Sequence, residues 1–232
     1  MKIAHITDLH VDEEFPNHYG VNPRQHLDQV LDDLRKRDID SIIFGGDIGE
    51  PNSNKWFFDY LKTFELRITP GNHDDSDTVV QFFKPDQLAS GLNWTEQLGP
   101  YSCIFMDSSK GVLDKEQMLW LSDQLNLLDQ AVIFLHHPVL NIGASADKEY
   151  ALKNQRDVRN LLVEKGIPIT VFCGHYHMAD ETSDTNIRQF ITPAISVQVI
   201  KDPDELKFDG STFGYRIIEL GKEIKSDLIM MV

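Results

Sequence analysis

The sequence predicts an α/β fold in which buried strands alternate with amphipathic helices. Three features of the chain indicate it. Short apolar runs rich in β-branched residues recur along the chain, and each is followed by a polar or glycine-containing turn, which is typical of buried strands. Between these runs lie stretches whose apolar residues keep the period of a helix. Strands that alternate with helices favour layers of sheet and helix.

The expected elements follow one another along the chain. Six apolar runs are predicted strands: Lys2–Thr7, Ser41–Phe44, Leu66–Thr69, Ser102–Met106, Ala131–Leu135 and Ile169–Cys173. Four stretches between them are predicted helices: Pro23–Arg37, Lys55–Thr63, Lys115–Leu128 and Ala151–Glu164. In the first of these helices, Leu27, Val30, Leu31 and Leu34 recur at a spacing that places them on one face.

The pattern changes after about residue 185, where only strand signals follow. Four runs are predicted strands: Arg188–Thr192, Ala194–Ile200, Phe213–Leu220 and Glu223–Met230. The dipeptide Asp209-Gly210 is a turn signal between two of them. We expect these consecutive strands to close a second sheet. Because the sequence contains no repeat, low-complexity tract or linker, we expect residues 1–232 to form a single domain.

The composition and charge exclude several functions. The 232 residues contain 22 Lys and Arg against 37 Asp and Glu, which gives a net charge of −15. Such a surface repels a nucleic acid polymer or an anionic membrane, so neither is an expected partner. The two cysteines, Cys103 and Cys173, are too few for a disulfide framework. The first residues read as neither a signal peptide nor a membrane span, so we expect a cytoplasmic location.

Polar side chains gather directly after five of the predicted strands. These are Asp8 and His10 after the first strand, Asp47 after the second, Asn72 and His73 after the third, His136 and His137 after the fifth, and His175 and His177 after the sixth. Loops at the carboxyl edge of a sheet are where α/β enzymes gather their chemistry. We therefore expect these side chains to form one site.

Seven of these side chains are candidate metal ligands. Residues two apart in an extended segment share a face, so Asp8 and His10 can point at one ion, and so can His175 and His177. A mixed set of carboxylate, imidazole and amide ligands suits Mn²⁺, Fe²⁺ or Zn²⁺. The candidates are Asp8, His10, Asp47, Asn72, His136, His175 and His177. They are too many for one four-coordinate ion and suit two ions that share a bridging carboxylate, a recurrent arrangement for displacement at phosphorus.

Each motif alone also has a structural explanation. Asp8 can cap a turn, and the segment Gly71–Asp74 can form a β-turn. The segments His136-His137 and His175–His177 can be polar residues that are satisfied near strand ends. Their occurrence together, in order and each after a strand, favours the metal site.

The ordered motifs resemble the signature of the calcineurin-like metallophosphoesterase superfamily. They are DLH at 8–10, GD at 46–47, GNHD at 71–74, His136, and GHYH at 174–177, and the resemblance runs from Lys2 to about Ile200. It implies a four-layer fold of two facing mixed β-sheets flanked by helices. Softer features resemble the bacterial class III cyclic-nucleotide phosphodiesterase branch: Gly20-Val21-Asn22, Gln117 with Trp120-Leu121, His136-His137-Pro138, and Thr192-Pro193.

The resemblance implies a role for each residue of the site. One ion is expected at Asp8, His10 and His177, the other at Asn72, His136 and His175, with Asp47 bridging both. His73 matches the family histidine that contacts the phosphate, and His137 is expected behind the ligands or against the substrate. Many relatives carry an aspartate where this chain has Glu50. Glu50 either orients the catalytic histidine from one methylene further out, or is unrelated and solvated.

The expected reaction is hydrolysis of a small phosphodiester, first of all a cyclic nucleotide of the 3′,5′-cAMP type. The alternatives are 2′,3′-cyclic nucleotides and glycerophosphodiesters. We expect a hydroxide between the two ions to attack phosphorus while His73 assists the leaving group. A phosphomonoesterase needs cationic groups to hold a dianion, and the motif loops contain no arginine. A non-catalytic scaffold of the same fold is disfavoured by the complete ligand set.

Substrate selectivity is expected from the loops between the motifs. The candidates for a substrate cap are Val11–Pro23, Asp75–Leu98 and Leu140–Asn154. The first of them carries Phe15, His18 and Tyr19, which either stack on a base or pack the loop. A homodimer is a further expectation, because relatives in the cyclic-nucleotide branch often dimerise and the C-terminal strands offer an edge.

Overall fold

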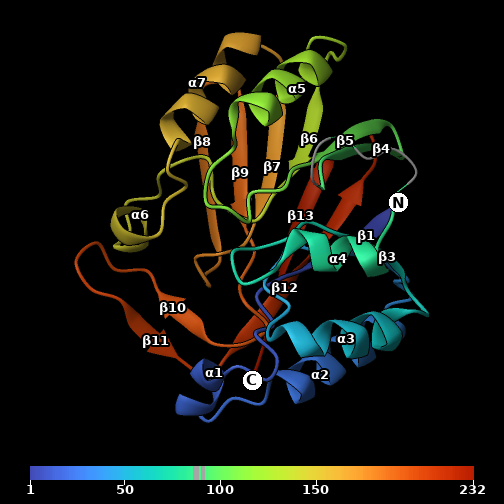
Figure 1. Cartoon of the computed structure of the whole chain (residues 1–232), viewed down its shortest axis with the longest axis vertical. Coiled ribbons are helices and arrows are strands. Elements are labelled where there is room, and N and C mark those ends of the chain that lie inside the picture. The colour runs from blue at the N-terminus through green and yellow to red at the C-terminus, as the bar shows by residue number, and fades with distance from the viewer. Residues whose placement is uncertain (86–88, 90–91) are drawn as a thin grey trace.

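Two mixed β-sheets face each other at the centre of the molecule (Figure 1). The structure, a computed structural model, describes residues 1–85, 89 and 92–232. The first sheet has the order β13-β12-β1-β2-β3 and contains β1 (Lys2–Ile6), β2 (Ser41–Phe44), β3 (Glu65–Ile68), β12 (Phe213–Leu220) and β13 (Ile224–Met231). Strands β1, β2 and β3 are parallel, whereas β12 runs antiparallel to both β1 and β13.

The second sheet has the order β4-β5-β6-β7-β9-β8. It contains β4 (Trp94–Leu98), β5 (Tyr101–Phe105), β6 (Ala131–Phe134), β7 (Ile169–Cys173), β8 (Asp180–Asp184) and β9 (Ile187–Ile191). Its four central strands are parallel, and the strands at both edges are antiparallel to their neighbours. The parallel strands of both sheets therefore bring their carboxyl ends, and the loops that follow, to one region of the molecule.

Helices cover the outer face of each sheet (Figure 1). On the first sheet these are α2 (Pro23–Lys36), α3 (Asn54–Leu61) and α4 (Ser76–Phe82); on the second they are α5 (Lys115–Leu125) and α7 (Gln155–Lys165). Two short helices, α1 (Glu14–His18) and α6 (Ala146–Glu149), and a 3₁₀ turn, η1 (Pro51–Ser53), lie in loops. The predicted four-layer α/β fold is confirmed.

Local sequence explains where the longer helices begin. The side chain of Asn22 accepts a hydrogen bond from the Gln25 backbone at the start of α2, and Pro23 occupies the first helical position. Helix α5 begins with a capping box between Asp114 and Gln117. The apolar face expected for the first helix is the buried face of α2, since Leu27 and its periodic neighbours are buried.

Three apolar layers hold the fold together, one under each set of helices and one between the sheets. The layer between the sheets contains a row of stacked rings that runs across five adjacent strands of the second sheet: Trp94, Phe105, Phe134, Phe172 and Phe190. Successive ring centroids are 3.9 to 5.4 Å apart. This row makes the inner face of the sheet apolar along its width, so the polar site is restricted to the strand ends.

The prediction that the C-terminal strands close one second sheet was wrong. Strand β9 joins the second sheet beside β7, whereas β12 and β13 join the first sheet. The expected strand Ala194–Ile200 is a strand only over β10 (Gln198–Ile200), which pairs with β11 (Lys207–Asp209) as a separate hairpin. Apolar alternation shows that a strand is buried but not which neighbour it pairs with, because pairing is decided by tertiary packing.

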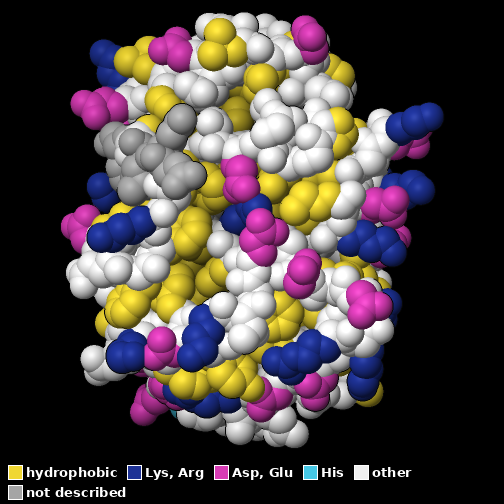
Figure 2. Space-filling view, turned by 90° about the vertical axis from the view of Figure 1, so that its right-hand side faces the viewer, with side chains coloured by type: hydrophobic (Ala, Val, Ile, Leu, Met, Phe, Trp, Pro, Cys, Tyr) yellow, Lys and Arg dark blue, Asp and Glu magenta, His cyan; other side chains and the backbone are white. Residues whose placement is uncertain are grey.

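The surface carries charges of both signs. On the face shown in Figure 2, Lys and Arg side chains are interspersed with Asp and Glu side chains. Within the described part of the chain, no helix has both the length and the apolar character that crossing a membrane requires.

Candidate metal centre

The side chains predicted at the strand ends come together in the structure. Loops after β1, β2, β6 and β7 bring six of the predicted ligands into two groups of nitrogen and oxygen donors: Asp8, His10 and His177 in the first donor cluster, and Asp47, His136 and His175 in the second donor cluster. Within each cluster, one donor atom per residue lies within 4.8 Å of the others. A further group of the same kind joins His10, Asp47 and His73.

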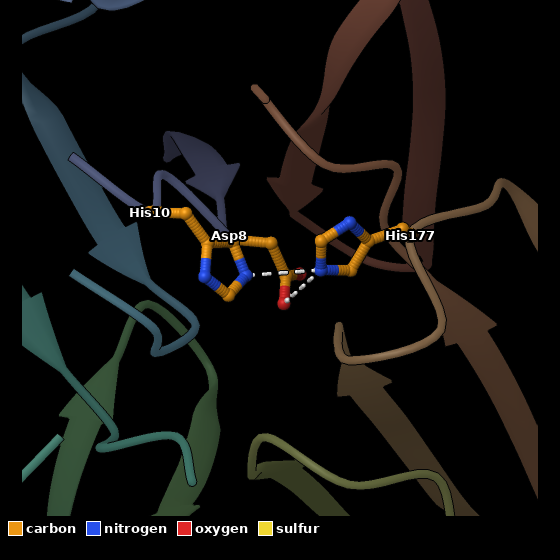
Figure 3. Close-up of side chains that lie close together, drawn as sticks. All are labelled: Asp8, His10 and His177. Atoms are coloured by element: carbon orange, nitrogen blue, oxygen red, sulfur yellow. Dashed lines mark hydrogen bonds and ion pairs between the residues drawn. The ribbon is translucent and has the colours of Figure 1, made fainter. Parts of the chain in front are cut away.

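The first donor cluster joins the loop after β1 to the loop after β7 (Figure 3). His10 Nε2 lies 3.0 Å from His177 Nε2. His177 Nε2 also lies 3.4 Å from Asp8 Oδ1. All three side chains are almost completely buried.

The second donor cluster is connected to the first through Asp47. His136 Nε2 lies 3.2 Å from Asp47 Oδ2 and 3.2 Å from His175 Nδ1. The same Asp47 oxygen lies 3.6 Å from His10 Nε2 in the first cluster. One carboxylate oxygen therefore lies between histidines of both clusters, which is the arrangement a bridging ligand requires.

The outward ring nitrogens of three cluster histidines donate to backbone carbonyls. The pairs are His136 Nδ1 to Gly45 O at 2.7 Å, His177 Nδ1 to Val197 O at 2.7 Å, and His175 Nε2 to Tyr150 O at 2.8 Å. A carbonyl oxygen only accepts, so each outward nitrogen carries the proton and a neutral ring turns a lone pair toward the cluster. This second contact is typical of metal-ligating histidine.

The facing nitrogens of the first donor cluster pose a chemical requirement. His10 Nδ1 donates to the Glu13 carboxylate at 3.0 Å, and His177 Nδ1 donates to a carbonyl. In neutral rings, both Nε2 atoms then carry lone pairs, yet they lie 3.0 Å apart. Two lone pairs at this distance repel unless a cation or a further proton lies between them. The donor set therefore fits divalent metal ions.

The ligand loops have unusual backbone geometry. Five candidate ligands have positive φ: Asp8 at 57°, His10 at 50°, Asp47 at 59°, His175 at 71° and His177 at 52°. Residues other than glycine rarely adopt this conformation, and such strain gathers at functional sites. The expectation that these segments are extended was therefore wrong. As a consequence, His175 and His177 do not share a cluster, although they are two residues apart.

The loop after β3 brings Asn72, His73 and Asp74 to the same place. The backbone N–H of His73 donates to Asp47 Oδ1 at 2.9 Å. Asp74 accepts from the backbone N–H groups of Asp47, Ile48 and Gly71, which fastens the loops after β2 and β3 to each other. Sequence reasoning assigned Asp74 no role, although it is the last residue of the GNHD motif. Asn72 lines the pocket beside the clusters.

A carboxylate that sequence reasoning missed contacts His73. Glu13 Oε1 accepts from His73 Nδ1 at 3.1 Å, while Glu13 Oε2 accepts from His10 Nδ1 at 3.0 Å. Glu50 is exposed, and among the described residues it is Glu13, not Glu50, whose carboxylate is within hydrogen-bond distance of the His73 ring. His137 packs behind the site: its ring lies 4.1 Å from that of His175, and its Nδ1 lies 2.9 Å from Ser108 Oγ.

Opposite charges control the protonation of the site. The hydrogen bond to Glu13 is the largest cause that raises the pKa of His73, which reaches about 9. Burial, the largest single cause, lowers the pKa of His136, but the charge of Asp47, its hydrogen bond to the ring and the charge of Asp8 together outweigh burial and raise it to about 9. Burial and the nearby His136 lower the pKa of His175 to about 4. Burial works against the ionised form of Asp47, yet His136 holds its pKa well below the usual range.

A pocket of about 300 Å³ lies over the donor clusters. Its apolar wall comes from three segments: Phe15 of α1, Ala146 and Tyr150 around α6, and Val199, Leu206 and Phe208 of the β10–β11 hairpin. Figure 1 shows α1, α6 and this hairpin along one edge of the molecule. Two of the expected cap loops, Val11–Pro23 and Leu140–Asn154, thus contribute, whereas the hairpin was not expected to.

The third expected cap loop, Asp75–Leu98, contributes none of its described residues to this pocket, and its residues 86–88 and 90–91 lie outside the described residues. The first loop carries the three residues expected either to stack on a base or to pack the loop. Phe15 lines the pocket and also packs on Tyr19 and Phe208, with ring centroids 5.4 and 5.3 Å away. Tyr19 does not line the pocket and packs the loop against Phe208, and His18 is exposed.

Comparisons with known proteins agree with this geometry. The chain is 28% identical over 252 residues to a protein of Pseudoalteromonas sp. (strain SM9913) named "Probable cyclic nucleotide phosphodiesterase", covering 100% of this chain and 94% of that protein. It is 29% identical over 198 residues to the glycerophosphodiester phosphodiesterase GpdQ of Enterobacter lignolyticus (strain SCF1), covering 76% of this chain and 71% of that protein.

A solved structure has the same fold. The crystal structure of a dimetal phosphatase from Danio rerio superposes with a TM-score of 0.62 at 13% identity, covering 99% of this chain and 98% of that chain. The sequence profile described as calcineurin-like phosphoesterase matches residues 1–179, most of the chain. The matched residues include all the strand-end motifs, and the chain therefore belongs to the calcineurin-like phosphoesterase family and is a hydrolase that acts on phosphoesters.

Proposed function

We propose that this hydrolase is a metal-dependent phosphodiesterase whose substrate is a cyclic nucleotide of the 3′,5′-cAMP type. The observation that carries the proposal is the contact between two donor clusters and a pocket with an aromatic wall. The clusters suit the phosphate, and the wall suits a planar base. The relative from Pseudoalteromonas, named for cyclic nucleotides and aligned over the whole chain, supports the same substrate.

Two divalent ions fit the donor set. Asp8, His10 and His177 would hold one ion, and Asn72, His136 and His175 the other, with Asp47 shared between them. When bound, such ions activate a water molecule and neutralise charge on the phosphate oxygens. Mixed oxygen and imidazole donors favour Mn²⁺, Fe²⁺ or Zn²⁺ over the hard ions that oxygen-only sites bind.

His73 is the proposed proton donor to the leaving group. Glu13 accepts from its Nδ1, so Nε2 is the ring nitrogen available to a substrate. In the metal-free protein the hydrogen bond to Glu13 raises the pKa of His73 to about 9, which favours the imidazolium, the form that carries a proton on Nε2 as well. It can therefore donate that proton to the departing ribose oxygen as the phosphorus–oxygen bond breaks.

The charge of the pocket favours a diester over a monoester. A phosphomonoester is a dianion at neutral pH, and its recognition normally uses Arg or Lys. Of the described residues that line the pocket, none is Lys or Arg, whereas Glu13 and Asp47 are carboxylates. The ions alone would balance the single negative charge of a cyclic diester. We expect selection against dianions because the described lining residues include no Lys or Arg.

The proposal is tested by comparing kcat/KM across substrates with Mn²⁺ supplied. The panel is 3′,5′-cAMP, 2′,3′-cAMP, glycerophosphocholine and a phosphomonoester such as AMP. We expect 3′,5′-cAMP to give the highest value and AMP the lowest. If glycerophosphocholine gave the highest kcat/KM, the substrate would instead be a glycerophosphodiester, the class for which the GpdQ relative is named. Preference for AMP would overturn the phosphodiesterase proposal.

Other expectations stay predictions. We propose that residues 1–232 form a single catalytic domain, and that the partner is a small molecule and not a nucleic acid polymer. A cytoplasmic location is supported by Cys103 and Cys173, both free and buried. A homodimer is supported by β13, which forms an edge of the first sheet and exposes Leu228 and Met230.

A further inference from the structure

One carboxylate joins the first donor cluster to the candidate catalytic histidine. The two oxygens of Glu13 are used separately: Oε2 accepts from His10 Nδ1 at 3.0 Å and Oε1 accepts from His73 Nδ1 at 3.1 Å. The two rings meet edge to face, with centroids 4.7 Å apart and planes at 88°. Only 13% of the Glu13 side chain and 4% of the His10 side chain are exposed, whereas the His73 side chain is 44% exposed. The protein therefore shields the His10 arm of this bridge from water, and the His73 arm lies at the surface of the site.

The turn that carries Glu13 is fixed on both sides. The preceding residue, Asp12, has a positive φ of 66° and accepts hydrogen bonds from Arg24 Nη2 at 2.5 Å and Ser53 Oγ at 2.6 Å. On the other side, α1 begins at Glu14, and Phe15 packs against the β10–β11 hairpin. The turn that presents the Glu13 carboxylate is therefore also held by contacts other than its hydrogen bonds to the two histidine rings.

A role in helix structure does not explain the Glu13 side chain. Glu13 is the N-cap residue of α1, but its side chain makes no capping hydrogen bond to that helix. The carboxylate is instead directed at two imidazoles. An imidazole that donates Nδ1–H to a carboxylate is fixed in one tautomer and orientation, with Nε2 turned to the opposite side. For His10, that opposite side is the first donor cluster, 3.0 Å from His177 Nε2.

We propose that Glu13 is the positioning residue of the site, a single carboxylate that sets the orientation of both the cluster histidine His10 and the catalytic histidine His73. This inference deepens the proposed function and rests on it for the role of His73. It assigns to the loop after β1 the task that the family pattern suggests for the position of Glu50. Because both rings donate to the same carboxylate, Glu13 also fixes the position of the first donor cluster relative to the proton donor His73.

Four variants test whether Glu13 positions the two histidines. In Glu13→Gln the amide keeps one acceptor oxygen, so it can accept from one ring but not from both. Glu13→Asp keeps both oxygens but withdraws them by one methylene. Glu14→Gln, on the exposed neighbouring residue, is the matched control. Glu50→Gln tests the position that the motif suggests.

Three measurements are made on each variant. Calorimetric titration of metal-depleted protein gives the affinity for Mn²⁺. Long-range ¹H–¹⁵N spectra of the histidine rings in the metal-free protein report which nitrogen is protonated. Turnover of 3′,5′-cAMP, which has a poor leaving group, is compared with turnover of bis(p-nitrophenyl) phosphate, which has a good one. The first two measurements do not depend on activity.

We expect Glu13→Gln to weaken Mn²⁺ binding about 10- to 100-fold, the usual effect of removing a carboxylate behind a ligand histidine. It should also change the ring spectra of His10 or His73, and lower kcat on 3′,5′-cAMP more than on bis(p-nitrophenyl) phosphate. Glu13→Asp should lie between it and the wild type. Glu14→Gln should match the wild type. If Glu13→Gln fails to fold, Glu13→Asp carries the same test with a smaller expected effect.

Two results would overturn the inference. One is wild-type Mn²⁺ affinity, ring spectra and leaving-group dependence in Glu13→Gln. The other is a loss in Glu50→Gln that equals or exceeds the loss in Glu13→Gln. Failure of the wild type to hydrolyse any phosphodiester would instead contradict the proposed function, and metal affinity and ring spectra would still decide whether Glu13 positions the two histidines.

Discussion

At the residue scale, three histidines of the metal centre use their two ring nitrogens for different contacts. In His136, His175 and His177, one nitrogen donates to a backbone carbonyl and the other faces the donor clusters. The ring orientation is therefore set by the backbone before any ion arrives, which reduces the ordering that binding requires. The positive φ angles of five candidate ligands cost of order 1–3 kcal/mol each, and the surrounding fold must sustain that strain.

The role of His73 can be separated from metal binding. His73→Ala removes the proposed proton donor, while the two donor clusters keep all their residues. We expect unchanged Mn²⁺ stoichiometry and a fall in kcat on 3′,5′-cAMP of about 10²–10⁴-fold, the usual contribution of general acid catalysis. Steady-state kinetics with elemental analysis of the same sample checks both. Full turnover of 3′,5′-cAMP by His73→Ala would exclude this role.

His5 links stability to pH. It lies fully buried in β1, and burial together with Arg216 lowers its pKa to about 3. Below pH 6.5 the unfolded chain binds a proton that the folded protein does not, so the free energy of unfolding falls with acidification by about 1.4 kcal/mol per pH unit. Between pH 7 and 5 this amounts to about 2 kcal/mol.

Urea unfolding of wild type and His5→Asn at pH 7 and pH 5, both free of metal, isolates that contribution. The wild type should lose about 2 kcal/mol more than the variant over this interval, because only the wild type carries the buried imidazole. Contributions from groups that do not interact with His5 cancel in the comparison. Equal losses in the two proteins would show that His5 does not resist protonation.

The sequence was sufficient to predict which residues meet but not how each side chain is directed. Asp8, His10, Asp47 and the later histidines were identifiable because each follows a strand whose end lies at the same edge. The family pattern implied that His175 and His177 belong to different ions, whereas extended geometry placed them on one face. Their separation depends on left-handed backbone at both residues, which neither the family pattern nor the residue spacing predicted. Glu13 carries no motif of its own, since its role arises from a turn that folds it back onto His10.

At the element scale, the β10–β11 hairpin completes the substrate pocket. It lies outside both large sheets and packs through Phe208 against Phe15 and Tyr19, with centroids 5.3 Å apart in each pair. The hairpin thereby holds the start of α1, and with it the turn that presents Glu13. A segment of three residues per strand thus contributes both an apolar wall and support for the polar site.

Phe208 offers a direct test of this wall. A base stacked on an aromatic side chain contributes about 1–3 kcal/mol, so Phe208→Ala should raise KM for 3′,5′-cAMP about 5- to 100-fold. KM for glycerophosphocholine, which has no base, should change much less. Phe208→Tyr keeps the ring and is the matched control. An equal rise in KM for both substrates in Phe208→Ala would mean that the hairpin supports the site without contacting a base.

The predictable elements were those with strong apolar periodicity. Strand β12 is almost entirely buried and was predicted with the bounds observed, Phe213–Leu220. Strand β8 has the sequence DETSD, which contains no apolar residue, and it forms only because it pairs with β9 at the edge of the sheet. The partners of β9 and β12 could not be predicted, because parallel or antiparallel pairing with β7 and β1 depends on residues far away in the sequence.

At the scale of the whole molecule, the net charge of −15 and the chemistry of the site act together. The ionised carboxylates of Asp8 and Asp47 are buried at the centre of the site, and two divalent ions would make that region locally positive. A small diester monoanion would meet the ions, whereas a long polyanion would meet the acidic exterior. The net charge therefore favours small substrates and does not exclude phosphate chemistry.

The central claim is that this chain binds two divalent ions through a shared carboxylate. Calorimetric titration of metal-depleted protein with Mn²⁺ tests it most directly, with Asp47→Asn as the paired variant, because Asp47 Oδ2 lies between the two clusters. We expect two ions per chain in the wild type, and loss of at least one in Asp47→Asn. A wild type that binds one ion or none, or an Asp47→Asn protein that binds two with wild-type affinity, would contradict it.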